Sequence, residues 1–259
     1  MHLAIYLTGD THYVYDLGKL LPEGFDTDGL TRDDYMIILG DWGFVWTPPC
    51  TPGSDRYGDY IEQERWVDWF ESQPYTTLWI DGNHENFDLL EGYPEEEWHG
   101  GRVQRIREHV IHLMRGQAYD IDGRTFFALG GAHSTDRRRR VPHESWWPQE
   151  VPSEAERAQA LATLDALGWK VDYVLTHAGP TRAMREIDPE PPFILQADEW
   201  TDWLQGVADK LSFKRWFFGH YHDDRWWEEP FTCLYNEVFD LDDTGRTKFG
   251  TGTDIFDVY

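Results

Sequence analysis

Acidic, histidine and amide side chains recur in short motifs along the chain, and these are the chemical types that bind metal ions. The motifs are Asp10-Thr11-His12, Gly40-Asp41-Trp42-Gly43, Gly82-Asn83-His84-Glu85, Thr176-His177 and Gly219-His220-Tyr221-His222. Nitrogen and oxygen donors without a thiolate suit Mn, Fe, Zn, Co or Ni ions, and they disfavour Cu(I) or a structural cysteine–zinc site. The motifs therefore predict a site for divalent transition-metal ions.

Each motif comes directly after a short apolar segment, which we interpret as a buried strand. These segments are residues 3–7, 36–39, 77–80, 171–175 and 215–218. In open α/β sheets the ligand crevice lies beyond the carboxyl ends of the strands. A single Asp-x-His motif arises readily by chance, but motifs after five strands indicate one shared site.

Helical patterns and hairpin signals occupy the rest of the chain. Helices are expected at 60–72, 153–167 and 198–211, and a hairpin through Asp122-Gly123 joins 118–121 to 125–129. The tail from 231 to 258 is rich in strand-forming residues, and a long loop spans about 133–152. The pattern predicts a mixed α/β sandwich rather than one uniform parallel sheet.

The composition excludes several classes of protein. The chain has 259 residues, with 23 Lys and Arg against 48 Asp and Glu, so its formal net charge is −25. This charge argues against binding of long nucleic acids, which requires clustered basic residues. With 14 Trp, 13 Tyr and 14 Phe, the chain is not a disordered acidic tail. At this length we expect a single domain, residues 1–259.

Several features predict a cytoplasmic protein. No apolar run is long enough to span a membrane, and residues 1–9 are interpreted as the first strand rather than as a signal peptide. Cys50 and Cys233 are too few for a disulfide framework, which fits a reducing compartment. We therefore expect no membrane partner. The oligomeric state does not follow from the sequence.

The set and order of the motifs resemble the calcineurin-like metallophosphoesterase superfamily. That pattern is Asp-x-His, Gly-Asp-x-x or Gly-Asp-x-Gly, Gly-Asn-His-Asp/Glu, a His after a strand, and Gly-His-x-His, matched here from residue 10 to residue 222. The segment from Asp81 to Asp88 is similar to that of bacterial and phage serine/threonine-phosphatase-like members. The resemblance implies a four-layer α-β-β-α sandwich of two mixed sheets, with two divalent ions, Mn first among them.

The resemblance also implies a role for each motif residue. The implied ligands are Asp10, His12 and His222 for one ion, Asn83, His177 and His220 for the other, and Asp41 as a bridging and catalytic residue. Two such ions lower the pKa of a bridging water, so a metal-bridging hydroxide would be the nucleophile. His84 matches the family's catalytic His, which stabilises or protonates the leaving oxygen, with an acidic residue nearby to orient its ring.

Two residues depart from the family pattern. Tyr13 stands where a Gly often follows Asp-x-His, so it would cover the first metal and narrow the range of substrates. Asp81 stands where protein phosphatases have a phosphate-binding Arg, and an acidic residue there would repel phosphate unless it points away.

The loop at 133–152 offers replacements for that missing Arg. Its four consecutive arginines, Arg137, Arg138, Arg139 and Arg140, are candidates for phosphate binding, the alternative being a solvated charge run. His133 follows a Gly-Gly turn at a strand end and is a further candidate for the rim of the site.

These residues predict an enzyme that hydrolyses a phosphomonoester or a phosphodiester. The substrate classes considered are phosphorylated small molecules, nucleotides and phosphopeptides, because one metal pair serves all of them. A protein Ser/Thr phosphatase is the alternative within enzymes. A non-catalytic metal-binding scaffold is the alternative of another class, and the presence of His84 and all seven ligand residues argues against it.

Overall fold

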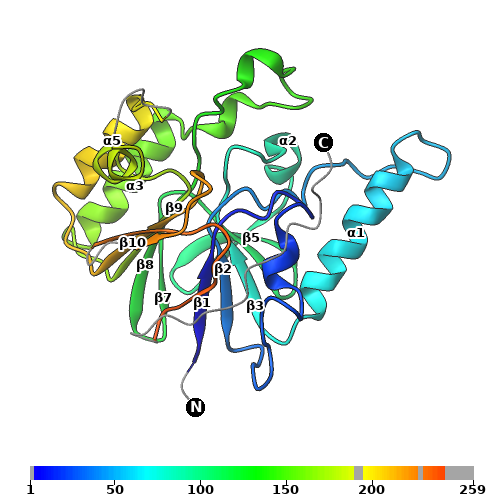
Figure 1. Cartoon of the computed structure of the whole chain (residues 1–259), viewed down its shortest axis with the longest axis horizontal. Coiled ribbons are helices and arrows are strands. Elements are labelled where there is room, and N and C mark those ends of the chain that lie inside the picture. Colours follow the sequence, from blue (N-terminus) through cyan, green and yellow to red (C-terminus); the bar gives the residue numbers. More distant parts are fainter. Residues whose placement is uncertain (1–2, 190–194, 227–229, 243–259) are drawn as a thin grey trace.

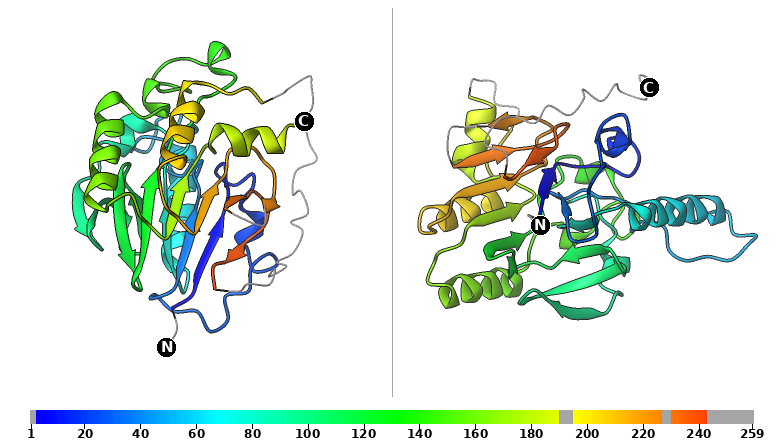
Figure 2. Two further views of the ribbon diagram at one scale, coloured as in Figure 1. Left: turned by 90° about the vertical axis from the view of Figure 1, so that its left-hand side faces the viewer. Right: turned by 90° about the horizontal axis from the view of Figure 1, so that it is seen from below.

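The computed structural model describes residues 3–189, 195–226 and 230–242. Two β-sheets pack against each other, with α3 and α5 on one outer side and α1 on the other (Figure 1). The two further views agree with this arrangement (Figure 2). The architecture is the four-layer α-β-β-α sandwich of mixed sheets that the resemblance implied, so the predicted fold class is confirmed.

The first sheet has a parallel centre and antiparallel edges. In spatial order its strands are β13 (Phe239–Asp240), β1 (Ile5–Thr8), β2 (Tyr35–Ile38), β3 (Thr76–Trp79), β6 (Val110–Leu113), β5 (Gly101–Arg107) and β4 (Glu95–Trp98). Strands β1, β2, β3 and β6 are parallel, so the first three of the predicted strands end at the same edge.

The second sheet repeats this plan. Its strands, in spatial order, are β11 (Arg225–Trp226), β12 (Phe231–Cys233), β10 (Arg215–Phe218), β9 (Tyr173–Thr176), β8 (Arg124–Leu129) and β7 (Gln117–Ile121). Strands β8, β9, β10 and β12 are parallel, and β7 pairs with β8 as the hairpin predicted from Asp122-Gly123. The β4–β5 hairpin was not anticipated from the sequence.

Alternate side chains of each strand enter different cores. In β2, Met36 packs against helix α1, whereas Ile37 packs between the two sheets, because successive strand residues face opposite sides. The core between the sheets contains side chains from both of them, including Leu7 and Phe217. A third core lies between the second sheet and its helices.

The three predicted helices are present with shifted ends. They are α1 (Tyr57–Ser72), α3 (Glu154–Ala166) and α5 (Glu199–Ala208). Ser153 caps α3, and its side chain and that of Glu156 form a reciprocal capping box. The short helices α2 (Phe87–Leu90) and α4 (Thr181–Ile187) were not predicted. The predicted strand-rich tail includes β12 and β13, and its part from residue 243 onward lies outside the described residues.

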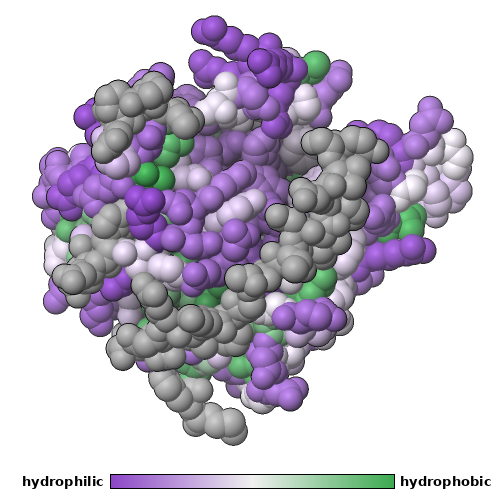
Figure 3. All heavy atoms as spheres, viewed as in Figure 1, coloured by the Kyte–Doolittle hydropathy of each residue, from purple (hydrophilic) through white to green (hydrophobic). Residues whose placement is uncertain are grey.

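The loop at 133–152 extends beyond the carboxyl ends of the strands (Figure 1). It contains short 3₁₀ turns at Arg137–Arg139 and Pro148–Glu150, and a third such turn, Leu17–Leu20, follows β1. The described residues on the face seen in Figure 3 are mostly hydrophilic, as the net charge leads one to expect. No helix within the described ranges combines the length and apolar character needed to cross a bilayer.

Candidate metal centre

The side chains predicted to bind metal come from strand ends in both sheets. Following β1, β2, β3, β9 and β10 in turn, they are Asp10 and His12, Asp41, Asn83, His177, and His220 and His222. The two sheets bring these ends together: the backbone N–H of His220 donates to Asp10 Oδ1 at 3.0 Å across 210 positions of sequence. The structure therefore shows the predicted convergence of these side chains at the carboxyl ends of the strands.

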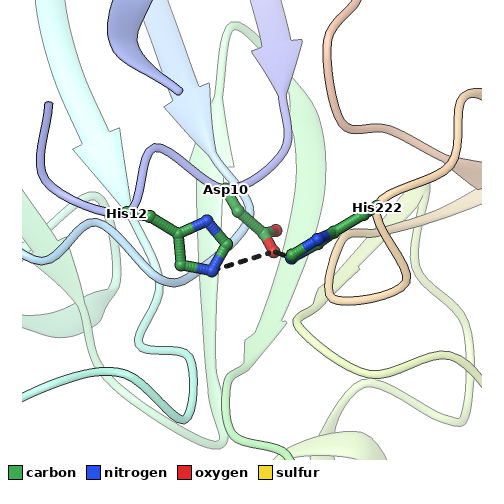
Figure 4. A group of neighbouring side chains, drawn as sticks. All are labelled: Asp10, His12 and His222. Carbon is green, nitrogen blue, oxygen red and sulfur yellow. Dashed lines mark ion pairs between the residues drawn. The ribbon is translucent and has the colours of Figure 1, made fainter. Parts of the chain in front are cut away.

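The first group of candidate ligands comprises Asp10, His12 and His222. The two imidazole rings lie on either side of the Asp10 carboxylate (Figure 4). Asp10 Oδ2 is 3.4 Å from His222 Nε2 and 3.9 Å from His12 Nε2. Asp10 is fully buried, whereas the His222 side chain is 50% exposed, so this group reaches from the protein interior to solvent.

The second group comprises Asp41, His177 and His220, with Asn83 beside them. Asp41 Oδ2 lies 3.3 Å from His177 Nε2 and 3.2 Å from His12 Nε2, so one carboxylate oxygen faces ligand nitrogens of both groups. Asn83 Oδ1 lies 3.1 Å from the same His177 nitrogen. Asp41 therefore lies between the two groups.

Hydrogen bonds behind the candidate ligands fix which atoms face the site. His177 Nδ1 donates to the Leu39 carbonyl at 2.7 Å, which leaves Nε2 for the site. Asn83 Nδ2 donates to Ser134 Oγ at 3.1 Å, which leaves Oδ1 for the site. Contacts of this kind set the tautomer and orientation of metal-binding side chains.

The backbone at the site adopts a conformation that L-residues rarely take. His12, Asp41, His220 and His222 all have positive φ, of 41°, 49°, 69° and 51°. Such strain is concentrated at functional sites, where the surrounding structure imposes it. The turn before Asn83 packs tightly against Asp41. A Cβ on Gly82 would lie 2.0 Å from Asp41 Oδ1, so this position requires glycine.

Buried carboxylates make the site attractive to positive charge. Burial acts to raise the pKa of Asp41, but His177, His84 and His12 hold that pKa well below its usual range. Burial likewise acts to lower the pKa of His177, while Asp41 and Asp10 raise it to about 9. Burial and the neighbouring His177 lower the pKa of His220 to about 3, which keeps that imidazole neutral. A bound metal cation would supply the positive charge that protonated imidazole groups otherwise supply to these ionised carboxylates.

One buried atom indicates directly that the residues fit a cation. Asp10 Oδ2 is buried and, although His222 Nε2 lies 3.4 Å away, it makes no hydrogen bond within the described part of the chain. A buried carboxylate oxygen in this state is costly unless a cation compensates it. Together with the nitrogen and oxygen donor set, this orphaned oxygen fits the divalent transition-metal ions that the sequence predicted.

His84 lies beside the candidate ligands and contacts Arg140 of the loop at 133–152. Its backbone N–H donates to Asp41 Oδ1 at 2.7 Å, and its ring centroid is 5.5 Å from that of His12. Its Nδ1 lies 3.0 Å from Arg140 Nη1. Asp41 is the acidic neighbour of the ring, since one of its carboxylate oxygens lies within 4.8 Å of a ring nitrogen of His84. Arg140 is a further neighbour, and Asp136 accepts two hydrogen bonds of 2.8 Å from Nε of that Arg.

The other substrate-binding candidates are placed differently. Arg137, Arg138 and Arg139 form an exposed 3₁₀ turn and do not line the cavity at the site. His133 is a half-buried residue whose Nδ1 is 3.8 Å from Glu150 Oε1. Of the four arginines, Arg140 is the one that reaches the site.

Asp81 points into the protein and not toward phosphate. It is buried, and one of its carboxylate oxygens lies 2.6 Å from Arg115 Nη2 while the other lies 3.2 Å from His112 Nε2. Arg115 also donates to the Gln149 carbonyl at 2.9 Å, which fastens the 133–152 loop to the end of β3. The acidic residue therefore has a structural partner of opposite charge.

A cavity of about 620 Å³ opens beside the first group. It is lined by His12, Tyr13, Tyr15, Asp16, Gly43, Trp46, Thr47, Arg56, Asp59, Glu62, Gln63, His84, Arg140 and His222. Tyr13, the residue after Asp-x-His, is among these lining residues. The cavity is of the size that takes a small organic ligand.

Sequence reasoning missed several residues that support the site. Asp16 Oδ2 lies 2.6 Å from His12 Nδ1, and their spacing of four residues was a usable signal. Glu85 accepts hydrogen bonds from the backbone N–H groups of Trp42 and Gly43, at 2.8 and 3.2 Å. Lys19 and Tyr235 also belong to this set, but no local pattern connects them to the motifs.

The family model for calcineurin-like phosphoesterases matches residues 3–224. Among solved structures, the chain is similar to phosphopantetheinyl hydrolase from Mycobacterium tuberculosis, with 18% sequence identity and a TM-score of 0.46, covering 95% of this chain and 98% of that chain. Comparison with curated proteins finds no match. The family match over most of the chain shows that it belongs to the calcineurin-like phosphoesterases, enzymes that hydrolyse phosphoester bonds with the help of metal ions.

Proposed function

We propose that the protein hydrolyses a phosphomonoester or phosphodiester with two divalent ions, one at each candidate group. When bound, such a pair activates a water molecule and neutralises the phosphoryl oxygens during in-line displacement. The observation that supports this most directly is Asp41, whose Oδ2 lies within 3.3 Å of both His12 Nε2 and His177 Nε2. A single carboxylate between two imidazole groups suits a bridging ligand.

His84 and Arg140 act on the phosphoester in this proposal. Arg140 can only donate, so His84 Nδ1 accepts and the hydrogen of the neutral ring is on Nε2. Burial and the nearby Arg140 lower the pKa of His84, although Asp41 opposes this, so the neutral form prevails at neutral pH. The Nε2–H then donates to an oxygen of the substrate, the leaving oxygen in particular.

Arg140 is also the candidate for the phosphate-binding Arg. Asp81 is buried against Arg115, so the position that holds this Arg in protein phosphatases makes no phosphate contact here. Arg140 lines the cavity with His84 and His12, close to the candidate ligands. We propose a substrate small enough for the cavity of about 620 Å³, such as a phosphorylated small molecule or nucleotide, with a phosphopeptide as the alternative.

Metal content and hydrolysis together test the proposal. Metal-free protein is reconstituted with Mn²⁺, its metal content is measured by mass spectrometry, and p-nitrophenyl phosphate and bis(p-nitrophenyl) phosphate are used as substrates. We expect two ions per chain, and hydrolysis that chelation abolishes and Mn²⁺ restores. Asp41→Asn should lower occupancy, whereas Asp68→Asn, a change of an exposed carboxylate on α1, should not. Absence of bound metal, or full activity in excess chelator, would contradict the proposal.

A further inference from the structure

The segment 234–237 crosses the turn that contains Asp10. A Cβ on Gly9 would lie 2.0 Å from the carbonyl oxygen of Leu234, so the crossing requires glycine at that position. The buried Lys19 Nζ donates to the carbonyls of Asp10, at 2.5 Å, and of Tyr235. The segment is therefore fastened to the loop of one candidate ligand.

The same segment is also fastened to the loop of a second candidate ligand. The backbone N–H groups of Tyr235, Asn236 and Glu237 donate to the carboxylate of Asp224, at 2.8, 2.9 and 3.0 Å. Asp224 lies two positions after His222. One carboxylate that accepts three backbone hydrogen bonds fixes a short segment firmly.

The side chain of Tyr235 contacts His222 directly and is linked to His12 through the carboxylate of Asp16. Its ring stacks on His222, with centroids 4.5 Å apart and planes inclined by 7°. Its hydroxyl donates to Asp16 Oδ1 at 2.8 Å, and Asp16 Oδ2 lies 2.6 Å from His12 Nδ1. Because the His222 side chain is 50% exposed, the stacked ring restricts rotamers that solvent would otherwise allow.

We propose that Tyr235 is a positioning residue for the first metal ion: it holds the His222 ring by stacking and, through Asp16, holds His12 with Nε2 facing Asp10 and Asp41. Tyr235 follows the region that the family model matches, residues 3–224. The inference rests on the proposed function, since it requires an ion at the first group. Its specific consequence is that loss of the Tyr235 hydroxyl weakens the binding of one metal ion and not of both.

Titration of metal-free protein with Mn²⁺, followed by calorimetry, tests this without reference to hydrolysis. Tyr235→Phe keeps the stacked ring and removes the hydroxyl, whereas Tyr235→Leu removes both contacts. We expect Tyr235→Phe to lower the affinity for one of the two ions about 10-fold, which is the lower end of the range for loss of a contact behind a metal ligand. Tyr235→Leu should lower that affinity further. His222→Ala identifies which binding step belongs to the first group.

Two comparisons separate a positioning role from general destabilisation. Tyr173→Phe makes the same chemical change at the start of β9, where the ring packs between Phe126 and Phe217, and should leave both affinities unchanged. Asp16→Asn should weaken the same ion, and the double variant with Tyr235→Phe should bind no more weakly than Asp16→Asn alone, because both changes break one linkage.

The outcomes distinguish this inference from the proposed function. If wild-type protein binds two ions and Tyr235→Phe binds both with unchanged affinity, the positioning role is wrong while the proposed function stands. An equal loss of affinity for both ions in Tyr235→Phe also overturns the positioning role. If wild-type protein binds no ion, the proposed function fails and the inference fails with it. Should Tyr235→Leu not fold, as judged by thermal melting, Tyr235→Phe decides the question.

Discussion

Arg140 Nη1 lies 3.0 Å from His84 Nδ1, and the two residues are 56 positions apart in sequence. The contact joins the exposed arginine run to the proposed catalytic His. Arg140 is itself held by Asp136 and by the Ser145 carbonyl, at 3.1 Å, so its guanidinium is a fixed donor. In the proposed function the arginine orients the ring of His84, a role that we had expected of an acidic residue.

Replacement of Arg140 by Met should lower turnover and raise KM together. The ring of His84 loses its donor partner, and a substrate phosphate loses the nearest cation of the loop. A preorganised hydrogen-bond donor to a charged oxygen contributes about 10²–10³-fold, so we expect a loss of roughly 10-fold or more when the orientation of the His84 ring is relaxed. Steady-state kinetics with p-nitrophenyl phosphate measures both parameters.

The neighbouring arginines provide the comparison for this prediction. A variant with Arg137, Arg138 and Arg139 all changed to Gln removes three exposed charges and keeps Arg140. Its KM should stay closer to the wild-type value than that of the Arg140 variant. An equal or larger rise in KM would show that the summed charge of the run matters and not the contact of Arg140.

Replacement of His84 by Ala should lower turnover about 10²–10³-fold, the range for loss of one hydrogen-bond donor to a charged oxygen of the reacting group, with metal content nearly unchanged. The groups Asp10–His12–His222 and Asp41–His177–His220 do not include His84, although His84 also lies within 4.8 Å of ligand atoms of His12 and Asp41. Asp41→Asn should instead reduce metal occupancy, because Asp41 faces both groups. Wild-type turnover in His84→Ala would show that the role assigned to His84 is wrong.

The convergence of the candidate ligands could be predicted from the sequence because strand ends are local signals; their role as ligands stays a prediction. Short apolar segments followed by Asp, Asn or His identify residues at one edge of each sheet, and the fold brings these edges together. The single-domain prediction for residues 1–259 stays a prediction, and it is supported by the core that Leu7 and Phe217 share between the sheets.

The supporting residues were not predictable in the same way. Tyr235 reaches Asp16 across 219 positions, and only tertiary packing creates that contact. Four identical arginines give no local signal of which one turns inward. Arg140 does so because the 3₁₀ turn ends at Arg139 and the backbone at Arg140 becomes extended, with ψ of 160°.

Replacement of Asp81 by Asn should destabilise the fold at neutral pH. Burial acts to raise the pKa of Asp81, but Arg115 and His112 lower it to about 2. A carboxylate with a depressed pKa stabilises the folded state above its unfolded pKa and loses that contribution as pH falls through the folded value. A shift of about two units corresponds to roughly 2–3 kcal/mol. Urea unfolding should therefore show a difference from wild type that is full near pH 7 and shrinks between about pH 4 and pH 2. A difference that does not change with pH would contradict the charge-based role.

Replacement of Tyr13 by Gly should widen the range of substrates. Tyr13 lines the cavity, has a φ of 60° and packs its ring against Phe44, with centroids 4.9 Å apart. Glycine adopts positive φ without the penalty of about 1–2 kcal/mol that other residues incur, which offsets part of the lost packing. Removal of the ring enlarges the cavity beside His12 and His84, so a bulky diester gains more than a small monoester. The kcat/KM for bis(p-nitrophenyl) phosphate, divided by that for p-nitrophenyl phosphate, should rise in Tyr13→Gly and stay near the wild-type ratio in Tyr13→Phe, which keeps the ring. An unchanged ratio in Tyr13→Gly would mean that Tyr13 does not limit substrate size.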